Sequence, residues 1–147
     1  MIKIEIKKIT TQTELEKAFQ LRIEVFVHEQ GVPLEDELDS FDCLNAACDH
    51  LLIYQGNEAV GTGRIRIVDG IGKLERIVVK KEARKDGIGK TIVTALEEIA
   101  KEKGLTKTKL HGQKHAENFY QKLGYTSASD IFLEDGIEHL IMIKEIA

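Results

Sequence analysis

The sequence predicts an α+β domain with αβα layering, in which helices cover both faces of one mixed, mostly antiparallel sheet. The strongest indication is the segment 74–100. There the apolar run 77–79 is followed by a charged turn, two glycines and apolar residues at helical spacing. A second indication is the length of 147 residues, which suits one domain with a sizeable core. A single domain is therefore expected to cover 1–147, without repeats, linkers or low-complexity segments.

The first part of the chain predicts a strand and then a helix. Isoleucines alternate with charged residues over 2–6, which is the pattern of a half-buried strand. Thr11 or Thr13 can cap the helix that follows, and Gly31 ends it. The acidic run 35–42 comes next and is expected as a solvated loop or short helix.

Three antiparallel strands should lead into the central helix. Strands at 51–54 and 59–68 are joined by a hairpin turn, and Asp69-Gly70 makes a second turn into the central strand at 77–79. The central helix then ends at Gly104, a residue suited to a helix C-terminus.

The last third predicts a strand, a helix and a closing hairpin. The strand is expected at 106–111 and the helix at 113–123. Residues 125–133 and 138–146 then form a hairpin around the turn 134–136.

Composition and charge narrow the function. The net charge of −4 argues against nucleic acid as the main partner. No stretch approaches the roughly 20 apolar residues of a membrane span, and the N-terminus lacks the apolar centre of a signal peptide. We therefore expect a cytoplasmic protein that binds neither nucleic acid nor membrane.

The two cysteines do not indicate a metal site. Cys43, Cys48 and His50 lie close in sequence, but their spacing matches no standard zinc pattern. Two thiols that pack near the start of a strand are the better explanation. We expect no bound metal and no cysteine nucleophile.

The glycine-rich turn 84–90 predicts a phosphate site. A helix N-terminus offers unpaired N–H groups and partial positive charge, and glycines let the backbone close on an anion. The spacing fits neither the Walker loop nor the dinucleotide fingerprint. What remains is R-x-x-G-x-G, from Arg84 to Gly89. A plain glycine turn between a strand and a helix would also explain this pattern.

A second motif lies one strand later, in 113–125. Its Ala116, Phe119-Tyr120, Lys122 and Gly124-Tyr125 resemble the A-x-x-F-Y-x-K-x-G-F/Y signature of the GNAT (GCN5-related N-acetyltransferase) superfamily, whose acyl-CoA loop the first motif also resembles. The two motifs stand in the family's order. The resemblance covers essentially the whole chain, and it implies the GNAT fold, with about six or seven strands flanked by about four helices.

The first third resembles the YjcF/ElaA-like branch of this superfamily. The residues that carry this likeness are Arg22, Val25-Phe26-Val27, Glu29-Gln30-Gly31-Val32-Pro33, Glu37 and Asp39, with His111-Gly112-Gln113 and Gly136-Ile137-x-His139-x-x-Met142 later in the chain. The likeness brings no physiological substrate with it.

The resemblance implies direct transfer of an acetyl group from acetyl-CoA to an amine in a ternary complex. The implied cofactor-binding residues are Ile77, Val78, Val79, Arg84, Lys85, Asp86, Gly87, Ile88, Gly89, Lys90, Gln113 and Phe119. The pantetheine arm would pair with the central strand, whose backbone can also polarise the thioester carbonyl. Tyr120 would protonate the thiolate leaving group, since a phenol is protonated at neutral pH.

The incoming ammonium must lose a proton, and Glu75 is the first candidate base. In a regular strand Glu75 shares a face with Ile77 and Val79, although a charge pair with Arg76 or Arg64 would also explain it. The alternatives that could instead line the acceptor pocket are Glu29, Gln30 and His111, with His139 structural or pocket-lining.

Two other functions fit parts of the sequence. The Glu37-x-Asp39-x-x-Asp42 pattern is also similar to acyl-homoserine-lactone synthases, which use S-adenosylmethionine but lack both motifs above. An acyl-CoA sensor that transfers nothing would keep the same loop.

The identity of the acceptor, a small molecule or a peptide amine, stays open. The acidic run favours a cationic acceptor, whereas Arg64 and Arg66 favour an anionic one. Homodimerisation is also left open.

Overall fold

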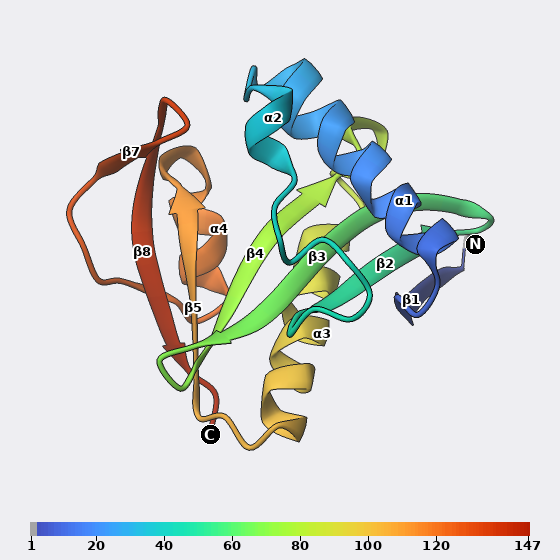
Figure 1. Ribbon diagram of the computed structural model, residues 1–147. Coiled ribbons are helices and arrows are strands. Elements are labelled where there is room, and N and C mark those ends of the chain that lie inside the picture. Colours follow the sequence, from blue (N-terminus) through green and yellow to red (C-terminus); the bar gives the residue numbers. More distant parts are fainter. Residues whose placement is uncertain (1–2) are drawn as a thin grey trace.

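The computed structural model describes residues 3–147 as one sheet between helices (Figure 1). Ile2, at the start of the predicted first strand, lies outside the described residues. In chain order the elements are β1 (Ile4–Lys8), α1 (Gln12–Arg22), the π-helix η1 (Ile23–Glu29), α2 (Leu34–Glu37), β2 (Asp49–Gln55), β3 (Glu58–Val68), β4 (Ile71–Val79), the 3-10 turn η2 (Lys81–Ala83), α3 (Ile88–Glu102), β5 (Lys107–Gln113), the 3-10 turn η3 (Lys114–Ala116), α4 (Glu117–Lys122), β6 (Thr126–Ser127), β7 (Phe132–Glu134) and β8 (Ile137–Glu145).

The sheet is mixed and mostly antiparallel, as the sequence predicts. Its strand order is β1-β2-β3-β4-β5-β8-β6, with β7 pairing to β8, and the β4–β5 pair alone is parallel among the described strands. The sheet has 8 strands rather than six or seven. The extra strand arises because 125–133, predicted as one strand, forms two short ones, β6 and β7, that both pair with β8.

Helices cover both faces of the sheet, which confirms the αβα layering (Figure 1). On one face α3 buries Ile92 and Leu96, and on the other α1 buries Leu15. Neighbouring residues of β2 serve opposite faces: Leu51 belongs to the α3 cluster and Leu52 to the α1 cluster. This alternation is the period of two that a strand buried on both faces requires.

The first predicted helix begins where the sequence suggests, but two of the predicted helices run differently from the expectation. Thr11 caps α1, and its side chain accepts a hydrogen bond from the N–H of Glu14 at 3.2 Å. The predicted helix continues as the π-helix η1 before Gly31 ends it at φ +78°. The predicted helix 113–123 is shorter, because β5 extends to Gln113 and the turn η3 precedes α4. No helix among residues 3–147 is long and apolar enough to cross a membrane.

Two glycines in β3 let α3 approach the sheet closely. A Cβ at Gly61 would lie 3.0 Å from side-chain atoms of both Ile88 and Ile92, and one at Gly63 would lie 2.7 Å from Ile92. Side chains here would push the helix away from the sheet. The close approach holds the N-terminus of α3 against the end of β4.

A bulge interrupts β4 at Arg76, which has the left-handed φ of +55°. The β3–β4 register shifts at the same level, between Thr62 and Arg64. Leu74, Ile77 and Val79 therefore all pack against the α3 cluster. The prediction that Glu75 shares a face with Ile77 and Val79 is wrong, because the extra residue of the bulge turns Glu75 to the α1 side.

Strands β4 and β5 separate after three paired positions. Their parallel pairing covers Gly72–Thr108, Lys73–Lys109 and Leu74–Leu110, and beyond Leu74 the strands diverge (Figure 1). From Glu75 onward β4 has no ladder partner on its β5 side. This opening in the middle of the sheet positions the candidate site.

Candidate active site

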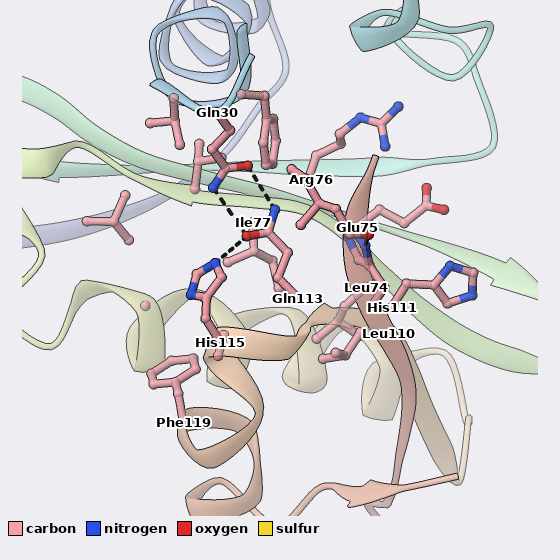
Figure 2. A pocket seen from close by; sticks show the side chains of 18 of the residues that line it. Gln30, Leu74, Glu75, Arg76, Ile77, Leu110, His111, Gln113, His115 and Phe119 are labelled. Carbon is pink, nitrogen blue, oxygen red and sulfur yellow. Dashed lines mark hydrogen bonds between the residues drawn. The ribbon is translucent and has the colours of Figure 1, made fainter. Parts of the chain in front are cut away.

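A cleft of about 610 Å³ occupies the opening between β4 and β5 (Figure 2). It is bordered by η1, the glycine turn before α3, the turn η3 with α4, and the hairpin of β7 and β8. Three groups of predicted residues line it: the end of β4 from Glu75 to Val79, the turn residues Arg84, Gly87, Gly89 and Lys90, and the side chains of Glu29, Gln30, His111, Gln113, Phe119 and Tyr120.

Three predicted cofactor-binding residues do not line the cleft with the others. Ile88 is 1 % exposed and packs in the core, while Asp86 accepts a hydrogen bond from Gln55 at 2.9 Å on the outer surface. Lys85 is exposed. The Ile88 side chain is therefore unavailable to a ligand in the cleft.

The glycine turn leaves backbone N–H groups of α3 without a side-chain cap among the described residues. Gly87 adopts φ +74° as the N-cap of α3, a 15-residue helix whose N-terminus carries no side-chain cap among residues 3–147. A Cβ at Gly89 would lie 3.1 Å from Phe119, so the turn also fits closely against α4. Uncapped N–H groups, the helix dipole and Lys90 together favour a negatively charged group such as a pyrophosphate.

The Arg84 side chain, which the sequence assigns to the same anion, is already engaged. Its Nη1 and Nη2 donate to the carboxylate of Glu29 at 2.6 and 2.7 Å, and its Nε donates to the Val79 carbonyl at 3.0 Å. Hydrogen bonding to Arg84 holds the pKa of Glu29 below its ordinary value. Three of the five N–H groups of the guanidinium are thus occupied, and an anion that needs these three must displace Glu29.

Tyr120 presents an unengaged hydroxyl to the cleft. Its ring packs edge-on against Phe119 and Tyr125, with centroids 5.0 and 6.1 Å away. Within residues 3–147 its hydroxyl makes no hydrogen bond, whereas the Tyr125 hydroxyl bonds to Thr108 and Glu97, each at 2.8 Å. Burial raises the pKa of Tyr120 to about 12, so the phenol stays protonated at neutral pH and can donate.

Glu75 lies at the cleft but is held by three cations. Its Oε1 is 2.9 Å from Arg64 and 3.0 Å from Arg66, and its Oε2 is 2.8 Å from Lys73. Burial alone would raise the pKa of Glu75, but hydrogen bonds from Arg66 and Lys73 and the charge of Arg64 outweigh it. They lower the pKa to about 2.

Three carboxylates of the acidic run 35–42 belong to the same ionic network. Asp42 bonds Arg22 at 2.7 Å and Arg64 at 2.9 Å. Glu37 bonds Arg22 and Arg76, while Asp39 bonds Arg64. The sequence offered these carboxylates and arginines as opposite indications of the acceptor's charge. In the structure they pair with each other inside the protein.

Two side-chain clusters line the rest of the cleft. Gln30 and Gln113 exchange amide hydrogen bonds of 3.2 and 2.8 Å across the opening, and His115 contacts Gln113 at 2.6 Å (Figure 2). His111 points away from this amide pair, and its Nδ1 lies 2.9 Å from Glu134. His139, predicted to be structural or pocket-lining, lines the cleft beside them.

Sequence reasoning missed Glu134 and the Arg76 bulge. Glu134 was predicted as the first residue of the hairpin turn 134–136, where a carboxylate is ordinary, and only the pairing of β8 with both β5 and β7 brings it to His111. The cysteines contribute nothing to the cleft, and burial raises the pKa of Cys48 to about 12.

An anion turn at a helix N-terminus, an open strand edge and a free tyrosine in one cleft define the class of acyl-CoA-dependent acyltransferases. Residues 11–146 match the family model described as "Acetyltransferase (GNAT) domain". The chain belongs to the GNAT acetyltransferase family and is an acyltransferase.

Relatives place it in the YjcF/ElaA-like branch. The protein YyaT of Bacillus subtilis is 55% identical over 98% of this chain and 97% of its own. The N-acetyltransferase YjcF of the same organism is 44% identical over 91% and 94%. The crystal structure of Escherichia coli ElaA superposes with a TM-score of 0.84 at 28% identity, covering 99% of this chain and 100% of that one.

Proposed function

We propose that this chain moves an acetyl group from acetyl-CoA directly to the amine of an acceptor, with both substrates bound at once. The single observation that carries the proposal is the unengaged Tyr120 hydroxyl in the cleft opened by β4 and β5. A chain that only sensed acyl-CoA would have no use for a free proton donor at this place.

The cofactor is expected to lie along the cleft from the glycine turn to β4. Its pyrophosphate meets the N-terminus of α3 and Arg84, and its pantetheine arm pairs with the open edge of Ile77 to Val79. A structure of the PaiA N-acetyltransferase from Thermoplasma acidophilum in complex with coenzyme A has the same fold, with a TM-score of 0.76 at 23% identity over 98% of this chain and 99% of that one.

The reaction then needs the acceptor nitrogen to lose two protons and the departing thiolate to gain one. The amine nitrogen attacks the thioester carbon, backbone N–H groups near the Arg76 bulge stabilise the developing negative charge on the oxygen, and the C–S bond breaks. Tyr120 gives its proton to the departing thiolate, and the nitrogen of the forming amide loses its second proton, which through solvent restores the Tyr120 phenol. Before the attack, the acceptor ammonium gives its proton to a base.

His111 suits the role of base better than Glu75. A carboxylate held by three cations with a pKa of about 2 has little tendency to take a proton at neutral pH. The imidazole of His111 lines the cleft, and its only hydrogen-bond partner among the described residues is Glu134. In this assignment Glu75 has a structural role and stabilises the bulge at Arg76 and the acidic run.

Two measurements test the proposal. Acetyl-CoA and CoA, added separately at 100 times their dissociation constants, should stabilise the protein against thermal unfolding by about 2.7 kcal/mol, and S-adenosylmethionine should not. With an amine acceptor found by screening, Tyr120→Phe should lower kcat about 100-fold while leaving CoA binding unchanged.

The matched control is Tyr54→Phe, which removes a hydroxyl that accepts only a 3.3 Å hydrogen bond from Lys17, outside the cleft. Stabilisation by S-adenosylmethionine alone would favour the synthase alternative. CoA binding without transfer to any amine would leave the sensor as the better description.

A further inference from the structure

The hairpin of β7 and β8 brings a carboxylate to the ring of His111. Gln113 of β5 pairs with His139 of β8, and Phe132 of β7 pairs with the same His139, so β8 lies between the two other strands. Across it, Glu134 Oε1 reaches His111 Nδ1 at 2.9 Å. The ring of Phe132 packs edge-on against the ring of His111, with centroids 5.2 Å apart and an interplanar angle of 81°.

This geometry determines which nitrogen of His111 carries the proton. An ionised carboxylate can only accept a hydrogen bond, so Nδ1 must donate. Nε2 of the neutral ring is then left with its lone pair. A hydrogen bond from His111 lowers the pKa of Glu134, which keeps this carboxylate ionised.

His139 does not compete for the same carboxylate when it is neutral. Its Nδ1 lies 2.7 Å from the carbonyl of Ile137 and donates there. Its Nε2 is 3.7 Å from Glu134, beyond hydrogen-bond distance, and carries a lone pair in that tautomer. The other charged groups near the pair are Asp135 in the hairpin and, from β4, Lys73 with its partner Glu75.

We propose that Glu134 is a positioning residue that holds His111 in the Nδ1-protonated tautomer and stabilises the imidazolium formed when Nε2 takes a proton from the acceptor ammonium. The inference rests on the proposed function. In the step, an N–H bond of the ammonium breaks, an Nε2–H bond forms, and one positive charge moves from the acceptor to the ring. Glu134 acts through the ring of His111.

Two variants separate the charge of Glu134 from its hydrogen bond. Glu134→Gln keeps an acceptor oxygen but removes the charge. The pH profile of kcat/KM should change, because the imidazolium has lost its counter-ion. Glu134→Ala removes both, and kcat should fall about 10- to 100-fold with an unchanged KM for acetyl-CoA.

The tautomer can be observed without any acceptor. Imidazole ¹⁵N chemical shifts, assigned by comparison with His111→Asn, should show Nδ1–H in the natural protein and a shift toward Nε2–H in Glu134→Ala. The matched control is Glu138→Gln on the exposed face of the same hairpin, which should change neither the profile nor the tautomer.

Unchanged ¹⁵N shifts in Glu134→Ala would overturn the inference, as would a Glu134→Gln profile that coincides with the natural one. Unchanged CoA binding shows that the variants are folded. If no amine is acetylated by the natural protein, the proposed function fails by itself, and the tautomer measurement still decides whether Glu134 positions the ring.

Discussion

The two ends of the cleft are built in different ways. The anion end comes from one contiguous stretch, Arg84 to Lys90, and depends mainly on backbone N–H groups and two glycines. The acceptor end is assembled from η1, β4, β5 and the β7–β8 hairpin, and depends on side chains. A local sequence pattern therefore specifies the first end, whereas the tertiary fold specifies the second.

The charges at the two ends differ as well. The pair of Arg84 and Glu29 lies at the surface, with side chains 37% and 39% exposed, so it can exchange partners at small cost. Arg64 is only 2% exposed and bonds three carboxylates. Removing one partner of such a buried pair leaves other charges uncompensated. The anion end can thus adapt to a ligand, while the ionic network beneath the acceptor end is fixed.

The largest effect should come from breaking this fixed network. Arg64→Met leaves Asp39, Asp42 and Glu75 with fewer partners in a buried place, so the free energy of unfolding should fall by about 3–5 kcal/mol. Arg84→Met removes an exposed pair and should change it by less than about 1 kcal/mol. Urea unfolding at pH 7 measures both. Similar losses in the two variants would contradict the contrast between the ends.

A smaller effect should depend on pH through Glu75. Its folded-state pKa of about 2 lies below the ordinary value of 4.5, so its contribution to stability is present above about pH 4.5 and is lost as the pH falls toward 2. Glu75→Gln should therefore lower the free energy of unfolding by about 3 kcal/mol at pH 7, and the difference should shrink below pH 4.5.

Glu35→Gln is the control for this prediction, because Glu35 belongs to the same acidic run but is exposed. A Glu75→Gln variant whose deficit is independent of pH would show that packing rather than charge explains the effect. The same variant tests Glu75 as the base, since a base is needed for kcat and a structural anchor is not.

Much of the fold followed from local patterns. The strand, glycine turn and helix at 74–100, the Thr11 cap and the strand at 51–54 each depend on neighbouring residues, and all three are confirmed. The Arg76 bulge was not predicted, because the left-handed φ of an arginine reflects tertiary constraints rather than its own preference. One inserted residue was enough to place Glu75 on the opposite face.

The candidate site was predictable to the extent that its residues are close in sequence. Gly87, Gly89, Phe119 and Tyr120 lie within two short motifs, and all four line the cleft. Glu134 is 23 positions from His111, and no local pattern links them. The pairing of Arg64 with the acidic run could not be predicted for the same reason. Taken separately, the acidic run therefore favoured a cationic acceptor and the arginine an anionic one.

The smallest effect expected concerns the adaptable anion end. If the CoA pyrophosphate must displace Glu29 from Arg84, Glu29→Gln should tighten CoA binding about fivefold, because a neutral amide competes less well for the guanidinium than a carboxylate. Arg84→Met should weaken binding at least about tenfold. Titration calorimetry measures both, with Glu16→Gln on the exposed face of α1 as control.

The gain in CoA affinity expected for Glu29→Gln should shrink at high salt, since the pair of Arg84 and Glu29 is exposed. In the double variant of Glu29→Gln and Arg84→Met this gain should vanish, because no guanidinium is left for which residue 29 and the pyrophosphate could compete. Weaker binding in Glu29→Gln alone would mean that Glu29 holds Arg84 in place for the pyrophosphate instead of competing with it.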